Sequence, residues 1–219
     1  ENAVVLASGR KVTANAVVLA IGVSPETRLA KETDLSIGET GAIWTNENYM
    51  TSDPDIYAVG DAIEVKNVLT GKPAKISLAG PALKQARTVA NHIHGISHSN
   101  SGYIGSSAIK VFGYNGASTG LNEALIEVMK MDIKYDVVHV ILSDKVGIMP
   151  DAAPMHFKLL YEVPSGRILG AQAIGRGDVT KRIDIIATII KMNGTLEVLK
   201  DLELCYAPPF STAKDIVNY

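Results

Sequence analysis

The first hundred residues alternate between short apolar runs and glycine-containing turns. The runs at residues 3–7 and 16–21 consist of Val, Leu, Ile and Ala with little interruption, and the second run ends at Gly22. Continuous apolar runs that end at glycine are typical of parallel strands covered on both faces. We therefore predict that both runs are strands of an α/β sheet, with a short strand at Lys11–Thr13 between them.

A further apolar run, at residues 56–59, predicts a buried strand that stops at Gly60 and Asp61. Ligands of open α/β sheets bind in the crevice outside the carboxyl ends of the strands, and a glycine there lets a ligand approach the backbone. The carboxylate of Asp61 accepts hydrogen bonds and suits the hydroxyl groups of a sugar or polyol. An Asp in this position also commonly caps a turn, and the residues alone leave both roles open.

Residues 80–93 have the pattern of an amphipathic helix, with Pro81 in the first turn, where proline is favoured. The unpaired N–H groups and the dipole at a helix N-terminus stabilise negative charge nearby. A carboxylate for hydroxyl groups at Asp61 and a helix start for an electron-rich ring edge together describe a flavin site. Plain packing of the helix is the alternative.

After residues 94–105, which are rich in Gly and Ser, the hydrophobic period changes to two. The alternating segments predict antiparallel strands at residues 107–113, 117–121, 134–142, 155–163 and 167–175. Residues 164–166 predict a hairpin between the last two strands. Helices are expected at residues 121–131 and 178–194, the second with Asp178 as its N-cap. Strands with two helices among them predict an α+β domain, and residues 94–105 are the expected domain boundary.

Composition narrows the class of protein. The chain has 219 residues, 47% of them hydrophobic, and a net charge of −2, which is an ordinary globular composition. It lacks the basic excess of a nucleic-acid binder, and apolar runs such as residues 183–190 are too short to span a bilayer, so neither partner is expected. The single cysteine, Cys205, suits a reducing cytoplasm, and we expect it to be a small buried side chain. The strand-like start without Met indicates a fragment of a longer protein.

Two further groups of residues have open interpretations. His92, His94 and His98 cluster in the sequence, but Gly95 interrupts the helical spacing and no acidic or Cys partner is near, so we expect no metal site. Lys181 and Arg182 lie near a helix start, where the dipole disfavours basic side chains. A phosphate-bearing ligand and a salt-bridged dimer face explain these two residues equally well.

The stretch TSDPDIYAVGD at residues 51–61 resembles the second FAD-binding signature of the flavin-dependent pyridine nucleotide-disulfide oxidoreductases, with Thr51, Ala58, Gly60 and Asp61 in the matching positions. Residues 19–27 resemble the end of that family's NAD(P)H-binding domain, and residues 77–93 resemble its flavin-facing helix. Residues 104–219 resemble its C-terminal dimerisation domain, so the segments follow the family's order. The resemblance implies the C-terminal part of an FAD/NAD(P)-binding Rossmann-like region followed by an α+β reductase dimerisation domain. The implied boundaries are residues 1–24 for the tail of the NAD(P)H-binding domain, 25–103 for the C-terminal segment of the FAD-binding domain, and 104–219 for the dimerisation domain.

The resemblance also implies roles for individual residues. Asp61 would hydrogen-bond the ribityl chain of FAD, and Leu78, Ala79 and Gly80 would lie against the pyrimidine side of its isoalloxazine ring. No G-x-G-x-x-G follows a strand in this chain. The dinucleotide pyrophosphate sites are therefore expected outside it. The resemblance implies that the redox cysteine also lies outside this chain, in the N-terminal FAD half.

The C-terminal stretch LELCYAPPFSTAKDIVN resembles the coenzyme A-disulfide reductase branch, in which the tyrosine that matches Tyr206 belongs to the active site. A phenol can donate a hydrogen bond or a proton to a thiolate, although a core or interface tyrosine is the alternative. The branch usually has a second tyrosine where this chain has Ile148 and Met149, which makes a persulfide, polysulfide or peroxide substrate more plausible.

Taken together, the resemblance implies FAD and NAD(P)H as cofactors and coenzyme A disulfide or a related small thiol or disulfide as substrate. It also implies a homodimer through residues 104–219, with Tyr206 acting in the partner's site. An NADH oxidase or peroxidase of the same fold and a non-catalytic dimerisation module are the alternatives.

Overall fold

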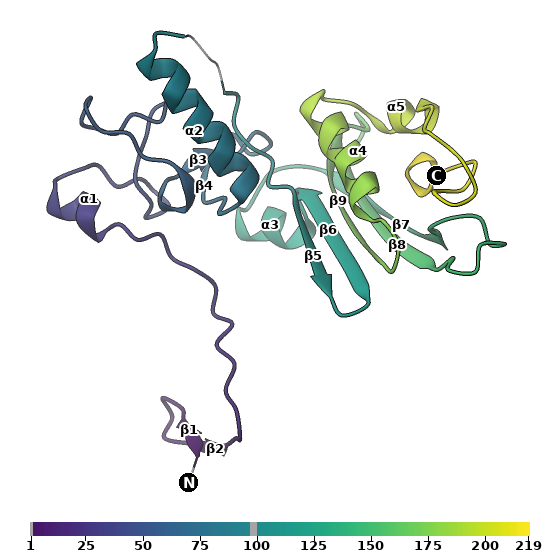
Figure 1. Ribbon diagram of the computed structural model, residues 1–219, viewed down its shortest axis with the longest axis horizontal. Coiled ribbons are helices and arrows are strands. Elements are labelled where there is room, and N and C mark those ends of the chain that lie inside the picture. Colours follow the sequence, from purple (N-terminus) through teal and green to yellow (C-terminus); the bar gives the residue numbers. More distant parts are fainter. Residues whose placement is uncertain (1, 97–99) are drawn as a thin grey trace.

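The computed structural model describes residues 2–96 and 100–219 (Figure 1). The first half contains β1 (Ala3–Val5), β2 (Lys11–Thr13), α1 (Arg28–Glu32), η1 (Gly60–Ala62), β3 (Val65–Lys66), β4 (Pro73–Ala74) and α2 (Ala79–Ile93). The second half contains β5 (Ser107–Val111), β6 (Tyr114–Gly120), α3 (Glu123–Val128), β7 (Tyr135–Ser143), β8 (Pro154–Glu162), β9 (Ile168–Gly175), α4 (Thr180–Lys191), α5 (Leu196–Asp201) and η2 (Ile216–Asn218). None of the helices in these ranges is long and apolar enough to cross a membrane.

The second half is the α+β unit that the sequence predicts. Within the described residues, five antiparallel strands form one sheet in the order β5-β6-β9-β8-β7. Strands β8 and β9 pair directly through the turn at residues 164–166, which confirms the predicted hairpin. The predicted helices are also present, as α3 and α4, whereas α5 was not predicted.

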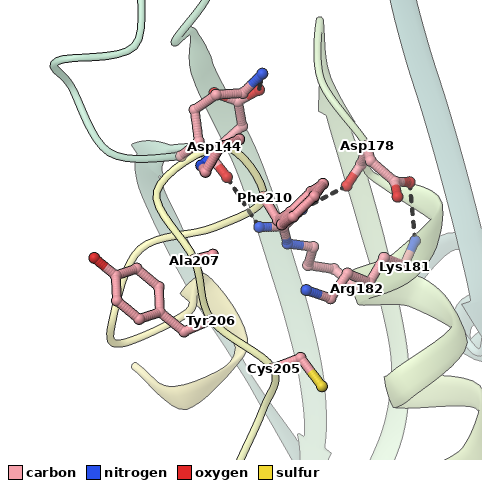
Figure 2. Close-up of a pocket in the computed structure, with 10 residues that line it drawn as sticks. Asp144, Asp178, Lys181, Arg182, Cys205, Tyr206, Ala207 and Phe210 are labelled. Atoms are coloured by element: carbon pink, nitrogen blue, oxygen red, sulfur yellow. Dashed lines mark hydrogen bonds and ion pairs between the residues drawn. The ribbon is translucent and has the colours of Figure 1, made fainter.

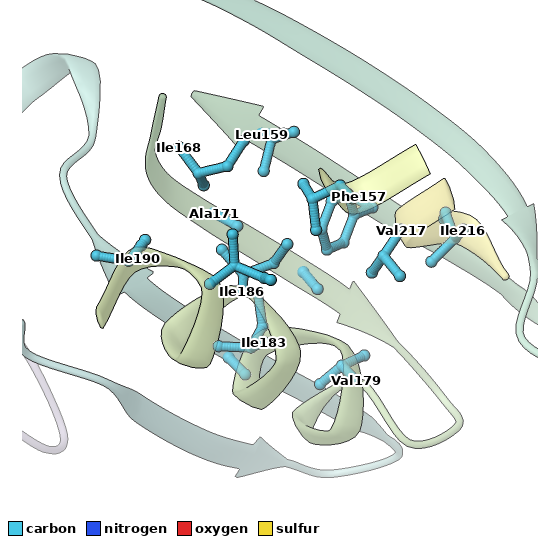
Figure 3. Close-up of a cluster of buried hydrophobic side chains, with 14 of the residues drawn as sticks. Phe157, Leu159, Ile168, Ala171, Val179, Ile183, Ile186, Ile190, Ile216 and Val217 are labelled. Carbon is cyan, nitrogen blue, oxygen red and sulfur yellow. The ribbon is translucent and has the colours of Figure 1, made fainter. Parts of the chain in front are cut away.

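The main core lies between α4 and one face of the sheet (Figure 3). On β8, Met155, Phe157 and Leu159 alternate toward this face, as the period of a strand requires. On α4, the buried isoleucines recur with the helical period, and Figure 3 shows Ile183, Ile186 and Ile190 directed at the strands. Burying each large aliphatic side chain stabilises the fold by about 1.5–3 kcal/mol, so this interface is the principal source of stability in the second half.

A smaller cluster lies on the other side of the sheet, where Leu160 of β8 and Leu169 of β9 pack with Leu121 and Ile126. Gly170 on β9 allows the close approach of this segment, because a Cβ at that position would lie 1.9 Å from the carbonyl oxygen of Leu121. The blocking atom belongs to the backbone and cannot rotate away.

We expect Gly170→Ala to lower the free energy of unfolding by about 3 kcal/mol, since overpacking against backbone forces the two segments apart. Gly113→Ala is the matched control, because a Cβ at Gly113 would meet no atom within 4 Å. Denaturant unfolding followed by circular dichroism measures both variants. Equal stabilities of the two variants would contradict the close approach.

Two of the four strands proposed for the first half do not form. β1 and β2 form, but as an exposed, two-stranded antiparallel pair and not as covered strands of a parallel sheet. Residues 16–21 form no strand and lie apart from the rest of the chain in Figure 1. A strand exists through its hydrogen-bonded neighbours, and no described strand lies beside this run. Its apolar side chains are therefore exposed, as at Ile21, which is 89% exposed. The strand prediction for residues 16–21 is wrong for the described chain.

The expected strand at residues 56–59 is also absent. Only one bridge, between Met50 and Tyr57, forms in this stretch, and both Ile56 and Val59 are partly exposed. Only one residue of this apolar run, Tyr57, is paired with a neighbouring segment, and a strand needs several paired residues. The predicted buried strand before Gly60 is therefore corrected to an extended segment that enters the 3-10 helix η1.

A small core nevertheless holds this half together. It gathers side chains from α1, the loops and the segment that leads to β5. At its edge the hydroxyl groups of Tyr49 and Tyr103 lie 2.7 Å apart, and the Asn100 side chain donates to both. Burial and the hydrogen bond with Tyr103 raise the pKa of Tyr49 far above its ordinary value, so its hydroxyl stays protonated. These contacts tie the expected domain boundary to the first half, although residues 97–99 of that boundary lie outside the described residues.

The predicted helix at residues 80–93 is confirmed as α2. Its buried residues are polar, however: Gln85 and Thr88 face the protein, whereas Ala86, Ala90 and Ile93 of the apolar stripe are exposed. The polar side chains are buried because they have hydrogen-bond partners: Gln85 accepts from the backbone of η1, and the Thr88 hydroxyl donates to the Lys84 carbonyl.

Candidate functional site

The turn at Gly60 and Asp61 is fixed to α2 by one buried side chain. The amide of Gly60 donates to Oε1 of Gln85 at 2.6 Å, and Gln85 is 1% exposed. Gly60 has a φ of +82°, in the left-handed region that favours glycine, and a Cβ there would meet no atom within 4 Å. The positive φ therefore explains why this residue is glycine, and the space that a Cβ would occupy is open.

Asp61 follows in the same turn and is exposed. The residue at the N-cap of η1 is Val59, and within the described part of the chain no hydrogen bond reaches the Asp61 carboxylate. The turn-capping role that the sequence left open for Asp61 therefore has no support in the geometry. The carboxylate is available as a hydrogen-bond acceptor for a ligand.

The start of α2 is open as well. Leu78 occupies the N-cap in an extended conformation and makes no side-chain capping bond, and the first turn holds no acidic residue. Ala79 and Gly80 are exposed and Leu78 is half-buried. The first N–H groups of the helix thus have no side-chain acceptor, and the helix dipole places partial positive charge there.

The structure therefore joins the five residues predicted for cofactor binding into one unit. Gly60 and Asp61 lie in η1, which packs against α2, and Leu78, Ala79 and Gly80 form the start of α2. An exposed acceptor and an uncapped helix start fit a cofactor with a polyhydroxyl chain and an electron-rich ring, so these residues fit FAD. Sequence reasoning missed Gln85, the residue that holds the unit together, because no motif marks it.

Tyr206 lies elsewhere, in a loop that follows α5. The loop borders a cavity of about 430 Å³ (Figure 2). Residues from two other segments share that cavity: Asp144 and Lys145 after β7, and Asp178, Lys181 and Arg182 at the start of α4. Tyr206 is 49% exposed, and Figure 2 shows its ring directed away from Arg182. The phenol is therefore presented at the surface, and the core alternative for this tyrosine is excluded.

Arg182 has a role that neither sequence-based alternative described. Its side chain is almost fully buried, and its Nε and Nη2 groups donate to the Asp215 carboxylate at 2.8–3.2 Å. Nη1 donates to the carbonyl of Asp178 at 2.8 Å, and Nη2 donates to that of Asp144 at 3.0 Å. Arg182 thus forms an ion pair inside its own chain and is not free to bind a phosphate. Lys181 beside it is half-exposed and lines the cavity.

Asp178 receives the hydrogen bonds of an N-cap, although the cap position itself falls on Val179. Its Oδ1 accepts from the Thr180 hydroxyl at 2.6 Å and from the Lys181 amide at 3.1 Å. Burial alone would raise the pKa of Asp178, but these hydrogen bonds and the charge of Arg182 hold it below its ordinary value. Asp178 therefore contributes a fixed negative charge at the rim of the cavity at neutral pH.

The positions of the expected second tyrosine lie on the loop between β7 and β8. The base of this loop is closed by hydrogen bonds between Asp144 and Ala153 and by the 2.6 Å ion pair of Lys145 with Asp151. Ile148 is 82% exposed near its tip. Asp144 and Lys145 line the Tyr206 cavity, so the loop with Ile148 and Met149 adjoins the site.

Cys205 corrects one prediction. It is exposed and lines the cavity beside Tyr206, whereas the sequence indicated a buried side chain. The loop that holds it has no helix or strand to enclose it. The described residues contain no group of three or more His, Cys, Asp or Glu that would hold a metal ion, and His98 lies outside them.

The two candidate parts are not brought together within one chain. Gly60, Asp61 and α2 belong to the core of the first half, whereas the segment after α5 packs on the core of the second half. Figure 1 shows α2 and the C-terminal segment on opposite sides of the molecule. A site that uses both parts therefore needs two chains.

Family models match both halves. Residues 1–86 match "Pyridine nucleotide-disulphide oxidoreductase", and residues 106–216 match "Pyridine nucleotide-disulphide oxidoreductase, dimerisation domain". Among curated relatives, a coenzyme A disulfide reductase of Staphylococcus epidermidis is 31% identical over 98% of this chain and 48% of that protein. An NAD(P)H sulfur oxidoreductase (CoA-dependent) of Pyrococcus furiosus is 34% identical over 96% of this chain and 47% of that protein. The chain spans about half the length of the curated relatives it matches.

Solved structures share the fold. Reduced CoADR-RHD of Bacillus anthracis is 47% identical with a TM-score of 0.92, over 99% of this chain and 39% of that one. An NAD-dependent persulfide reductase of A. fulgidus is 38% identical with a TM-score of 0.89, over 96% and 39%. The water-forming NADH oxidase of Lactobacillus brevis is 25% identical with a TM-score of 0.86, over 99% and 49%. With a dimerisation-domain match over half of its length and this fold, the chain belongs to the pyridine nucleotide-disulphide oxidoreductase family.

Proposed function

We propose that this chain is part of an FAD-dependent NAD(P)H:disulfide oxidoreductase that reduces coenzyme A disulfide or a related persulfide or polysulfide. The observation that carries the proposal is the exposed Asp61 carboxylate in a turn that Gln85 ties to α2, a helix whose start is uncapped. The names of the relatives, which include coenzyme A disulfide and persulfide reductases, support the substrate class.

In this proposal the first half contributes the FAD site. Asp61 accepts hydrogen bonds from the ribityl hydroxyl groups, and Leu78, Ala79 and Gly80 lie against the pyrimidine side of the ring, where the helix dipole stabilises negative charge. When bound, FAD would take up hydride from NAD(P)H and pass the electrons on toward the disulfide. The protein's part is to orient the cofactor and to balance its charge.

Tyr206 is the proposed catalytic residue of the second half. Its half-exposed phenol would donate a hydrogen bond or a proton to the thiolate that leaves when the disulfide is cleaved. Because Tyr206 lies away from Asp61 in its own chain, it would act in the site of a partner subunit. The proposed assembly is therefore a homodimer through residues 104–219.

One face of the sheet supports such a dimer. Ile109, Ile174 and Ile141 are exposed and belong to one row of paired residues that runs across all the strands through Gly116 and His156. The row lies on the face opposite α4, because its member on β8 lies between two residues that are buried under that helix. An exposed apolar row of this kind is typical of a surface that another chain covers.

The same proposal includes the domain boundaries and the cellular location. We assign residues 1–24 to the tail of the NAD(P)H-binding domain, 25–103 to the C-terminal segment of the FAD-binding domain and 104–219 to the dimerisation domain. The positions of the two family models, at residues 1–86 and 106–216, support the second of these boundaries. A single exposed cysteine with no disulfide in the chain supports a reducing cytoplasmic environment.

The test uses the full-length protein that contains this chain. We expect a yellow preparation with flavin absorption that consumes NADH or NADPH and releases free thiol when coenzyme A disulfide is added under nitrogen. NAD(P)H consumption that requires oxygen or peroxide would favour the oxidase alternative, which the likeness to the Lactobacillus brevis oxidase keeps open. A colourless dimeric preparation would favour a non-catalytic dimerisation module.

A further inference from the structure

The loop that presents Tyr206 has little structure of its own. Residues 203–215 contain no helix or strand, and Tyr206 is near their start. Inside the loop, the amides of Phe210 and Ser211 donate to the carbonyl of Ala207 at 2.9 and 3.3 Å. The Ser211 hydroxyl donates to the carbonyl of Cys205 at 3.4 Å, near the limit of a hydrogen bond. The Thr212 hydroxyl also donates to the carbonyl of Lys214 at 2.6 Å, and Leu204 packs against the core, so the contacts at the ends of the loop add to these in setting the position of Tyr206.

The start of the loop is anchored to the C-terminus. The side-chain amide of Asn218 donates to the carbonyls of Leu199 at 2.9 Å and Leu202 at 3.2 Å, at the end of α5. Ile216 and Val217 beside it are buried in the core under α4. The chain therefore returns at residues 216–218 to the place from which the loop departs.

The end of the loop is anchored by Arg182. Asp215, the last loop residue, is 3% exposed, and its carboxylate receives three contacts from the Arg182 guanidinium. The same guanidinium donates to the carbonyls of Asp144 and Asp178. One buried, planar cation thus joins three segments that border the Tyr206 cavity: the β7–β8 loop, the start of α4 and the C-terminal loop.

We propose that Arg182, through Asp215, is a positioning residue for Tyr206. With both ends fixed, the loop has fewer conformations, and less entropy is lost when Tyr206 is held at a reacting group. A lysine at position 182 keeps the charge but cannot bind the carboxylate and two carbonyls in one plane. The inference rests on the proposed function, because it assigns Arg182 an effect on turnover only through Tyr206.

The experiment is a double-mutant cycle in the full-length, FAD-loaded protein with coenzyme A disulfide as substrate. We expect Arg182→Lys to lower kcat about tenfold in the wild-type background and less than about twofold in the Tyr206→Phe background, since coupled residues are not additive. Asp215→Glu keeps the ion pair but shifts the loop end, and we expect a smaller loss in the same direction. Asp215→Glu takes the place of Arg182→Lys in the cycle if Arg182→Lys does not fold.

Two further readouts separate positioning from a general loss of structure. Hydrogen exchange of the Phe210 and Ser211 amides should become faster in Arg182→Lys, whereas the rate at which NAD(P)H reduces the flavin should stay at the wild-type value. Arg167→Lys is the matched control, because Arg167 pairs with Glu162 away from the loop. It should change neither the exchange rate of these amides nor the rate of flavin reduction.

The outcomes distinguish the inference from the proposed function. If Tyr206→Phe lowers kcat but Arg182→Lys leaves kcat and exchange unchanged, or lowers kcat equally in both backgrounds, the positioning role is overturned and the proposed function stands. If Tyr206→Phe leaves kcat unchanged, the catalytic role of Tyr206 and the positioning role of Arg182 are both overturned.

Discussion

Replacing Tyr206 by phenylalanine in the full-length protein is expected to lower kcat for coenzyme A disulfide about 100-fold, which is within the usual range for losing a positioned proton donor. The change removes one oxygen and keeps the ring, so the loop after α5 should keep its conformation. Stopped-flow absorption at the flavin band should show reduction by NAD(P)H at the wild-type rate, because that half-reaction does not involve the phenol.

Tyr161→Phe is the matched control for this prediction. The Tyr161 hydroxyl donates to Asp136 at 3.2 Å on the β7–β8 strand pair and does not line the cavity of Tyr206. The control should retain full turnover. Equal losses in the two variants would show that Tyr206 matters for folding and not for chemistry.

The second large effect is expected at Asp61. Asp61→Ala removes the exposed acceptor of the Gly60–Asp61 turn, and losing a hydrogen bond to a charged group costs about 1.5–3 kcal/mol. This corresponds to a dissociation constant for FAD raised about 10- to 100-fold, since 1.4 kcal/mol is a factor of ten. The ratio of flavin to protein absorbance after gel filtration, followed by titration with FAD, measures the change.

Asp55→Ala serves as the control for Asp61, because Asp55 is an exposed carboxylate nearby on the surface of the same loop region. It should purify with as much flavin as the wild-type protein. Full flavin content in Asp61→Ala would place the ribityl-binding acceptor elsewhere. With the flavin removed, both variants should unfold at the temperature of the flavin-free wild-type protein, since neither carboxylate accepts a buried hydrogen bond within the described residues.

The second half of the fold could be predicted because each of its signals is local. Strand alternation at Met155, Phe157 and Leu159 and the helical period of α4 specify the two surfaces that bury each other within the same chain. The turn at residues 164–166 specifies that β8 pairs with β9. Pattern and partner are both present there, and the predicted elements form.

In the first half the apolar pattern alone was not sufficient to predict the strands. The runs at residues 16–21 and 56–59 are as apolar as the strands of the second half, yet they form no strand in the described chain. An apolar pattern says which side chains favour burial, whereas a strand requires a particular neighbour to pair with. On α2 the pattern was misleading in another way, because the helix buries Gln85 and exposes Ala86 and Ala90.

Some residues of the candidate site could likewise be predicted from the sequence, and others could not. Gly60, Asp61 and the start of α2 could be named from sequence because a glycine, a carboxylate and a helix start each have a distinct chemistry. Gln85, which joins them, is a single amide on a helix and gives no signal until the fold is known. The ion pair of Arg182 with Asp215 joins residues that lie far apart in sequence, and only the packing of the C-terminal segment under α4 reveals it.

The central claim is that one site takes its flavin from one chain and its tyrosine from another. Subunits with Asp61→Ala, assayed without added FAD, and subunits with Tyr206→Phe should each have little activity as homodimers, and the two can be mixed, dissociated and reassembled. Random pairing makes half of the dimers mixed, and each mixed dimer would have one intact site, so we predict coenzyme A disulfide reduction at roughly a quarter of the wild-type rate per dimer. If the reassembled mixture is no more active than the separate variants, Tyr206 does not act in the partner's site and the account is contradicted.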